Sequence, residues 1–344
     1  MVGPRESHCL RRHKLSFMKT LLKAGLSTDG YNLTAYRGSI TAANIIGHQG
    51  NTYYFDPTNG SNNNNGKSPK HAVADIATGY GLLTAGQNDT LVYLAGTTSA
   101  SITDTLDWAK AYTHLVGMGA PTEVGQRARI FNSGNSSAST PLLKVSASGC
   151  SFGNLYLFQG SAVATVGALE VTGGRNCFEN VHIAGMGHAT ASAGVNAYSL
   201  KLNAAAENTF VGCTIGVDTI KRTAANKQLW LDGDCKRNIF KNCRFLSHAE
   251  VNTYTLVTFQ DAGAADRFME FENCKFYNFW ANHGGTLLGA FTIPAGMTTN
   301  DILIHGNCTL YGILEWDSAD RAGTWIGGPA PAAATSGIAV KPAT

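Results

Sequence analysis

The sequence predicts an all-β solenoid, built from short parallel strands that stack coil upon coil, and two repeated motifs carry this prediction. In the first motif a Phe or Ile is followed two positions later by Asn or Gly. It begins at residues 152, 178, 210, 240, 271 and 304, so successive copies lie 26, 32, 30, 31 and 33 residues apart. A repeat of this length is typical of solenoids and propellers.

The second motif keeps the same spacing and consists of an apolar, an outward-facing and an apolar residue. The alternation places neighbouring side chains on opposite faces of a strand. A turn cluster such as Asp232-Gly233-Asp234 follows each copy, so one period holds at least two short strands. The six copies are Leu143-Lys144-Val145, Leu169-Glu170-Val171, Leu200-Lys201-Leu202, Leu229-Trp230-Leu231, Val257-Thr258-Phe259 and Phe291-Thr292-Ile293.

Other repeat architectures do not fit this pattern. Helical repeats need apolar residues three and four apart over ten or more positions, leucine-rich repeats are shorter, and propeller blades are longer. The remaining architecture is a coil of parallel strands about 4.8 Å apart. Equivalent residues should then align, with Phe210, Phe240 and Phe271 in one inward stack. Cys213 and its equivalents in later coils should form another.

The cysteines are expected to fill the core as free thiols. The chain has 8 cysteines and no Cys-x-x-Cys pair, and stacked cysteines form a row, which does not suit the tetrahedral geometry of zinc. We therefore predict no metal site and no cofactor. Reduced thiols indicate assembly in a cytosol.

The chain is expected to have three parts: an N-terminal basic arm and entry segment (1–50), the β-helix (51–316) and an extended C-terminal arm (317–344). Residues 1–23 contain six basic residues and one acidic residue, a balance of +5 against +3 for the whole chain. The arm has few aromatic residues and the body has no basic stripe, so nucleic acid is not the expected partner. Met1 and Met18 are alternative starts.

Neither a membrane span nor a signal peptide is expected, because no apolar run is long enough for the first and the N-terminus lacks the pattern of the second. Only 14% of the residues are charged, and the chain contains 39 Gly. A weakly charged surface of this kind suits packing against copies or partners.

The segment from Tyr53 to Gly96 reads as the beginning of the solenoid. A strand ends in Asp56-Pro57, a Gly/Asn-rich loop leads to Ser68-Pro69, and a segment with helical spacing precedes Asp89-Thr90-Leu91-Val92-Tyr93-Leu94. A short helix here should cap the open end of the coil, which would otherwise expose unpaired strand edges.

Together with the Phe-x-Asn-Cys-x-Phe motifs of later coils, this opening resembles the right-handed parallel β-helix proteins of the pectin-lyase-like superfamily, over roughly residues 50 to 315. The resemblance implies a single-stranded right-handed parallel β-helix. It does not fix the function, because the superfamily includes polysaccharide lyases, glycoside hydrolases, epimerases, phage tailspikes and other virion proteins.

The catalytic motifs of the galacturonase-like hydrolases and of the pectate lyases are absent from the sequence. Glycoside hydrolysis needs two carboxylates a few ångströms apart, and Asp232, Asp234 and Asp261 are the candidates, because they fall in equivalent turns of adjacent coils. The favoured interpretation is that they are turn residues whose side chains bind their own backbone.

Arms at both ends of a weakly charged rod resemble phage virion proteins, which often assemble as trimers. We therefore expect a structural protein of a bacteriophage virion, assembled in the host cytoplasm: a capsid-decorating or capsid-stabilising homotrimer that binds capsid or other virion proteins through its arms. The alternative is a tailspike-type depolymerase acting on a host surface polysaccharide. The residues expected in assembly are Arg11, Arg12, Lys14, Lys19 and Trp325.

Overall fold

The computed structural model describes residues 50–132, 134, 137–265, 267–279, 287–297, 302–317, 324–326 and 339–340. The chain divides into two compact units, Met1–Gln49 and Gly50–Thr344, and all described residues belong to the second. None of the helices among them is long and apolar enough to span a membrane.

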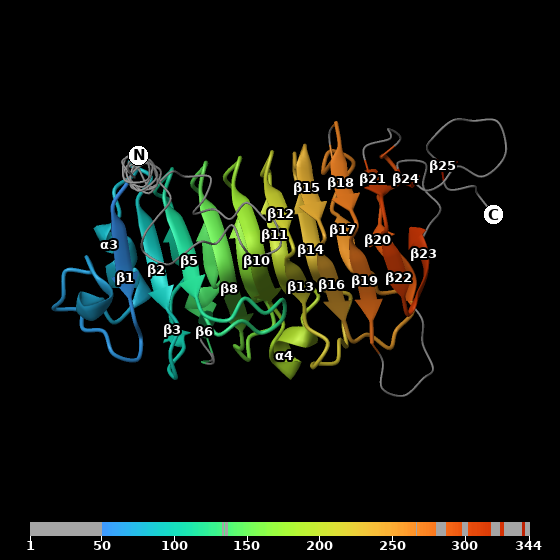
Figure 1. Ribbon diagram of the computed structural model, residues 1–344. Coiled ribbons are helices and arrows are strands. Elements are labelled where there is room, and N and C mark those ends of the chain that lie inside the picture. Colours follow the sequence, from blue (N-terminus) through green and yellow to red (C-terminus); the bar gives the residue numbers. More distant parts are fainter. Residues whose placement is uncertain are drawn as a thin grey trace, which may run out of the picture. The chain divides into compact units, whose positions relative to one another are not determined.

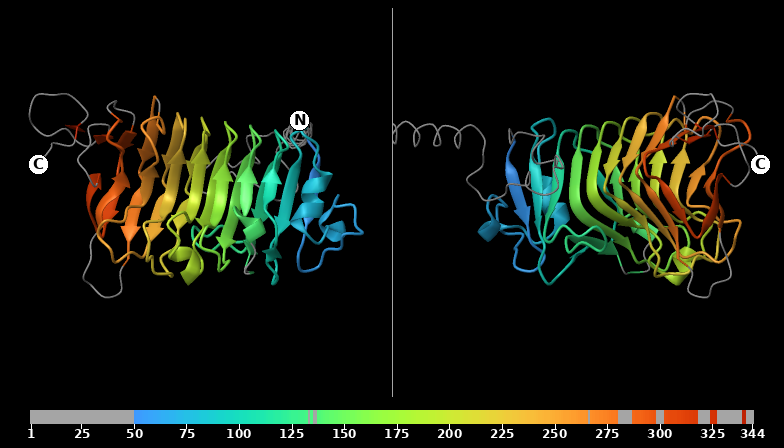
Figure 2. Two further views of the ribbon diagram at one scale, coloured as in Figure 1. Left: turned by 180° about the vertical axis from the view of Figure 1, so that it is seen from behind. Right: turned by 45° about the vertical axis from the view of Figure 1, so that its right-hand side comes forward.

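The second unit is a parallel β-helix, as the repeats predict. Its strands lie side by side in chain order from β1 to β23 (Figure 1), and the view from behind and the view turned by 45° show each coil against the preceding one (Figure 2). A typical coil contributes one strand to each of three ladders. All pairings within the ladders are parallel except that of β25 with β24, which is antiparallel.

The first and second ladders form one seventeen-stranded sheet, and the third ladder is a separate eight-stranded sheet. The long strands β8 (Ser151–Gln159) and β10 (Cys177–Ala184) pass through both of the first two ladders. The first ladder also contains β1 (Thr52–Phe55), β2 (Thr90–Leu94), β5 (His114–Met118), β12 (Thr209–Val211), β15 (Asn238–Lys241), β18 (Met269–Glu272), β21 (Ile302–His305), β24 (Thr324–Ile326) and β25 (Ala339–Val340). The second adds β3 (Ala100–Ser101), β6 (Arg129–Asn132), β13 (Thr214–Gly216), β16 (Arg244–Ser247), β19 (Lys275–Asn278) and β22 (Thr309–Tyr311).

The third ladder carries the apolar triplets of the second sequence motif. Leu143 pairs with Leu169, and the register continues through the equivalent apolar residue of each later coil as far as Phe291, whose partner in the last strand is Asp317. Its strands are β4 (Leu106–Trp108), β7 (Leu143–Val145), β9 (Gly167–Val171), β11 (Tyr198–Asn203), β14 (Lys227–Asp232), β17 (Val257–Phe259), β20 (Leu287–Thr292) and β23 (Ile313–Asp317).

The Asn or Gly of the first motif forms the corner between the first two ladders. Asn242 and Asn273 have φ values of 55° and 54°, in the left-handed region that Asn and Gly tolerate best. Their equivalents Asn154, Asn180 and Gly212 have φ values of 53°, 51° and 60°. The corner residue turns the chain, and the strand of the second ladder follows at once.

The predicted aromatic stack is confirmed and is longer than expected. Phe152, Phe178, Phe210, Phe240 and Phe271 are buried, and neighbouring rings are parallel within 9° with centroids 4.7 to 5.0 Å apart. The strand spacing of a sheet imposes this distance. The stack lies inside the coil and forms a large part of its core.

Among the described residues, four short helices lie outside the ladders. The helix expected near the beginning of the solenoid is α3 (Ile76–Leu82), whose N-cap Asp75 accepts a hydrogen bond from the backbone N–H of Thr78. Ile76 and Gly79 are buried. That α3 caps the coil, and that the coil is right-handed, stay predictions. The other helices are η2 (Pro69–His71), η3 (Ser137–Ser139) and α4 (Ala189–Ser192).

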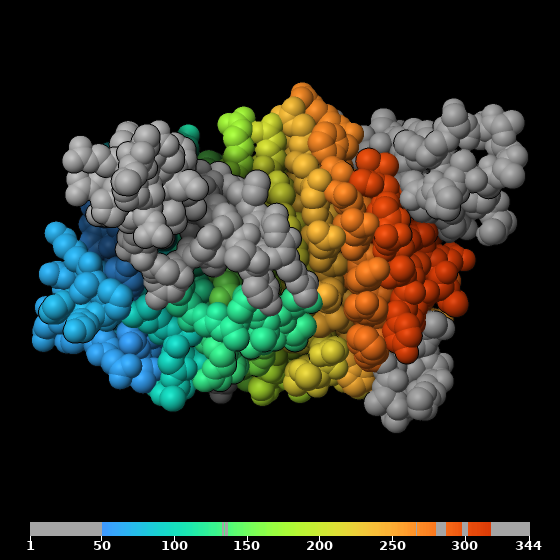
Figure 3. Space-filling view, in the orientation of Figure 1, coloured from blue at the N-terminus to red at the C-terminus, as the bar shows by residue number. Residues whose placement is uncertain are grey.

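One corner is much longer than the others. Between β5 and β6, residues Gly119–Ala128 leave the coil and run across the outside of later coils; we call this segment the strap. Its Gln126 donates to the backbone carbonyl of Asn180, its Glu123 carbonyl accepts from Thr214, and its Glu123 carboxylate pairs with Arg244. In the space-filling view this blue-green segment extends toward the yellow coils (Figure 3).

Candidate functional site

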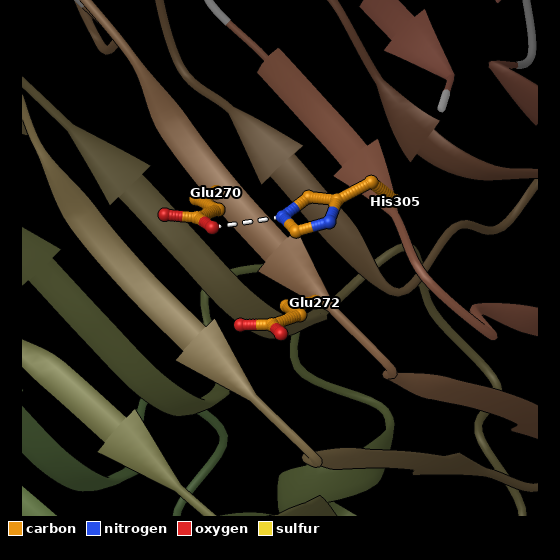
Figure 4. Close-up of side chains that lie close together, drawn as sticks. All are labelled: Glu270, Glu272 and His305. Carbon is orange, nitrogen blue, oxygen red and sulfur yellow. Dashed lines mark hydrogen bonds and ion pairs between the residues drawn. The ribbon is translucent and has the colours of Figure 1, made fainter. Parts of the chain in front are cut away.

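Two glutamates and a histidine converge on the outer face of the first ladder (Figure 4). Glu270 and Glu272 flank the inward Phe271 on β18, so both point outward, as expected for a strand. His305 on β21 lies opposite Glu272 in the register. Its Nε2 lies 2.8 Å from Oε1 of Glu270, and one ligand atom from each of the three residues lies within 4.8 Å of the others.

A lysine from the preceding coil joins this cluster. Nζ of Lys241, on β15, lies 2.7 Å from Oε2 of Glu272. The hydrogen bond between them lowers the pKa of Glu272 and raises that of Lys241. Basic and acidic side chains therefore lie side by side on three successive coils, in the pairs Lys241–Glu272 and Glu270–His305. Pairs of this kind at a partly exposed surface contribute little to stability.

The cluster is the one group among the described residues whose donor set could approach a metal ion. Two carboxylates and an imidazole suit several divalent ions. Each carboxylate already has a partner, however, Glu270 in His305 and Glu272 in Lys241. The sequence analysis did not single out His305, because the register between coils decides which side chain lies opposite the glutamates.

Of the three predicted carboxylates, Asp232 lies at the end of a third-ladder strand and Asp234 and Asp261 lie in the turns that follow such strands, and each has a partner. Asp232 ends β14 and lies 2.7 Å from Nζ of Lys201 on the adjacent β11. Asp234 forms an ion pair with Lys236. Oδ1 of Asp261 accepts the backbone N–H of Gly263 at 2.9 Å. These contacts give Asp232 a role in joining coils and Asp261 a role in its own turn.

An aromatic residue with two lysines lies beside Asp232 on the outer face of the third ladder. Nζ of Lys201 lies 4.2 Å and Nζ of Lys227 lies 4.4 Å from the ring centroid of Trp230. The indole Nε1 donates to Gln260 at 3.0 Å. Sequence reasoning placed Trp230 outward in its triplet but assigned it no partner, since both lysines reach the ring only through folding.

The cysteine row is confirmed for the described residues, in which every cysteine is free. Each thiol in the row lies against the carbonyl of the first-motif aromatic one coil earlier. The Sγ atoms of Cys213, Cys243, Cys274 and Cys308 lie 3.3 to 3.4 Å from the carbonyl oxygens of Phe178, Phe210, Phe240 and Phe271, respectively. Burial raises the pKa of the nearby Cys177 thiol to about 12, which disfavours a reactive thiolate.

Exposed apolar side chains gather where the second and third ladders end. Phe279, Leu288, Tyr311 and Leu314 are 42%, 37%, 58% and 64% exposed; we call these four residues the terminal patch. The rings of Tyr311 and Phe279 lie 5.4 Å apart, and Tyr277 lies against both. Among the described strands, β22 and β23 are the last of their ladders.

Of the predicted assembly residues, Trp325 alone lies among the described residues. Arg11, Arg12, Lys14 and Lys19 lie outside the described residues. Trp325 lies in β24, where its backbone pairs with that of Leu303 on one side and Val340 on the other. Its assembly role stays a prediction.

Comparison with known proteins shows only distant likenesses. No protein family matches the sequence, and no curated protein sequence matches it. Among solved structures, pectate lyase Pel9A has a TM-score of 0.44 and 15% identity, covering 74% of this chain and 63% of its own. Pectin methylesterase PemA from Erwinia chrysanthemi has a TM-score of 0.43 and 14% identity, covering 77% and 80%. ORF18 of Geobacillus virus E2 has a TM-score of 0.34 and 9% identity, covering 73% and 57%.

Likenesses at these TM-scores and identities carry no argument about what this protein does. The chain spans less than two thirds of the pectate lyase that it resembles. At such identities the same fold carries unrelated activities. The function must therefore be argued from the side chains of this molecule.

Proposed function

We propose that this protein is a structural subunit of a bacteriophage virion, and that it decorates or stabilises the capsid as a homotrimer. Its neighbours are copies of itself and other capsid or virion proteins, bound in part through the arms 1–50 and 317–344. The virion assignment rests on the resemblance to phage β-helix proteins noted in the sequence.

The terminal patch carries the assembly part of this proposal. Four large apolar side chains, each at least 37% exposed, gather at one end of the rod, where they extend the outer faces of β19, β20, β22 and β23. Contiguous apolar surface is characteristic of protein interfaces rather than of free surfaces. The patch also has aromatic members, which interfaces favour.

The internal design agrees with a structural role. The aromatic stack, the cysteine row and the corner residues repeat the same contacts from coil to coil. Such a rod presents a fixed surface over its length. The carboxylates singled out as catalytic candidates hold lysines or their own turns.

The decisive experiment locates the chain in purified phage particles by cryo-electron microscopy. We expect many copies on the capsid shell, grouped around three-fold positions. A few copies at the tail, or none in the particle, would refute the capsid assignment.

A second experiment tests self-association. We expect the purified full-length chain to sediment as a trimer, and the double variant Tyr311→Ser and Leu314→Ser to shift at least tenfold toward monomer. Val195→Ser, at a 57% exposed position outside the patch, is the matched control. A wild-type monomer at tens of micromolar would refute the trimer, and an unchanged double variant would exclude the patch as the interface.

A polysaccharide depolymerase is the second candidate, favoured by one observation. Asp232 lies beside Trp230 and Lys201, and an aromatic ring next to a carboxylate is an arrangement that could hold and cleave a sugar. Replacing Asp232, Asp234 and Asp261 by Asn tests it on host surface polysaccharide. Loss of a wild-type depolymerase activity with the fold intact would favour the enzyme, and absence of activity in the wild type would eliminate it.

A further inference from the structure

A buried histidine of β10 is one of the contacts that attach the strap to the outside of the coil. His182 is only 4% exposed, although it points away from the core of the coil. Its ring stacks on Tyr156 of β8 with centroids 4.5 Å apart and an interplanar angle of 12°. The strap lies over it and supplies the backbone N–H of Gly125.

Both ring nitrogens of His182 have fixed and opposite hydrogen-bonding roles. Nδ1 accepts the N–H of Gly125 at 3.0 Å, so it must carry a lone pair. Nε2 lies 3.0 Å from the carbonyl oxygen of Gly216, so it must carry the proton. This is one tautomer of the neutral imidazole. A second proton, on Nδ1, would face the N–H of Gly125 and break the contact with the strap.

We propose that the strap is an acid-sensitive element: it stays closed over β10 and β13 while His182 is neutral, and it detaches when His182 is protonated. Detachment exposes the outer face of the corner, including Asn180 and Thr214, which contact the strap in the closed state. The inference does not depend on the proposed virion function.

Few charged groups lie around His182 in the described part of the chain. None of these groups provides a hydrogen-bond acceptor for a protonated Nδ1, whose only partner among the described residues is the N–H of Gly125. Asp218, which follows β13, favours the imidazolium electrostatically. Arg129 lies 5.3 Å from the ring centroid of Tyr156, on which His182 stacks. The strap carboxylate Glu123 is held by Arg244. Burial outweighs the other influences and lowers the pKa of His182 from 6.5 to about 4.

The direction of the pH effect follows from these values. With the strap detached, the imidazole reaches water and its pKa returns toward 6.5. Between pH 6.5 and 4 the detached form therefore binds more protons than the closed form, and closure weakens as the pH falls through this window. The opening equilibrium should rise about 30-fold between pH 7.5 and pH 5. Below pH 4 both forms are protonated and the effect is complete.

Hydrogen exchange of the full-length chain, measured by mass spectrometry from pH 7.5 to pH 4.5, tests the proposal. Protection factors are referred to the intrinsic exchange rate at each pH. We expect amides 119–128 to lose at least tenfold protection by pH 5, while the amides of β12 and β15 keep theirs. Protection of the strap that does not change with pH would overturn the proposal.

Two variants separate His182 from other acid effects. In His182→Gln the amide oxygen can still accept from Gly125 but gains no charge, so the acid-induced loss should disappear. In Glu123→Gln the other titratable contact is removed and the loss should persist. The same loss in His182→Gln, or its disappearance in Glu123→Gln, would overturn the assignment to His182.

If His182→Gln leaves the strap open at every pH, the titration of His182 in the wild-type protein tests the proposal instead. Histidine signals in NMR spectra of the labelled protein, assigned by their disappearance in His182→Gln, give its titration directly. Titration together with loss of strap protection supports the proposal. Titration near pH 6.5 with the strap still protected would overturn it.

Discussion

Replacing Asn238 by Asp should destabilise the coil strongly, although it changes only one group of the side chain. Asn238 is fully buried. Its Nδ2 donates to the carbonyl oxygens of Ala205 at 2.8 Å and Cys235 at 3.0 Å, and its Oδ1 accepts the N–H of Asn208 at 2.9 Å. A carboxylate keeps the acceptor and loses both donors.

The expected cost follows from the two carbonyls left without a donor. Each unsatisfied buried group costs about 1–3 kcal/mol, so the variant should lose about 2–6 kcal/mol of unfolding free energy at pH 7. Burial raises the pKa of the new carboxyl in the folded state above its ordinary 3.9. The deficit is therefore full above that folded pKa and shrinks as the pH falls through it, because a protonated carboxyl can donate one hydrogen bond.

Urea unfolding at pH 7 and pH 4.5, followed by circular dichroism, measures the deficit at both conditions. Asn242→Asp is the matched control, since Asn242 is exposed and its φ of 55° is one that Asp also tolerates. The control should lie within about 0.5 kcal/mol of wild type. A loss below 1 kcal/mol for Asn238→Asp, or a loss that grows toward acid pH, would refute this account of Asn238.

Two further predictions concern the core. Phe240→Ala should cost about 3–5 kcal/mol in urea unfolding, because the ring is stacked on both sides, whereas Phe279→Ala, at a 42% exposed position, should cost less than about 1 kcal/mol; equal losses would contradict the stack as a source of stability. Burial raises the pKa of Tyr93 to about 12, so the unfolded state ionises first and stability should fall as the pH rises from 10 toward 12. Tyr93→Phe should lack this part of the alkaline loss, and an identical alkaline profile in the variant would contradict it.

The fold could be predicted from sequence because its main contacts repeat at equal intervals. The stack from Phe152 to Phe271 and the triplets of the third ladder occupy the same place in every coil. The number of strands per coil was harder to predict. The first and second ladders meet at a corner as short as Asn242-Cys243, so two strands read as one motif.

The candidate sites were less predictable, because they depend on side chains from different coils. Glu270 meets His305, and Lys201 meets both Asp232 and Trp230, only through the register between strands. The strap contains no copy of either repeated motif. Its Gly125 contacts His182, 57 positions away in sequence, and no local sequence pattern predicts such a contact.

The strap also fixes the length of the part of the rod that it crosses. In a solenoid each coil contacts only its neighbours, so whole coils can be gained or lost during evolution without disturbing the rest. Between Asn154 and Arg244 this freedom is restricted, since a strap of ten residues must reach β10, β13 and β16 at fixed places. An inserted coil would carry Arg244 about 4.8 Å beyond its partner. Changes in rod length should therefore accumulate after Arg244, toward the terminal patch.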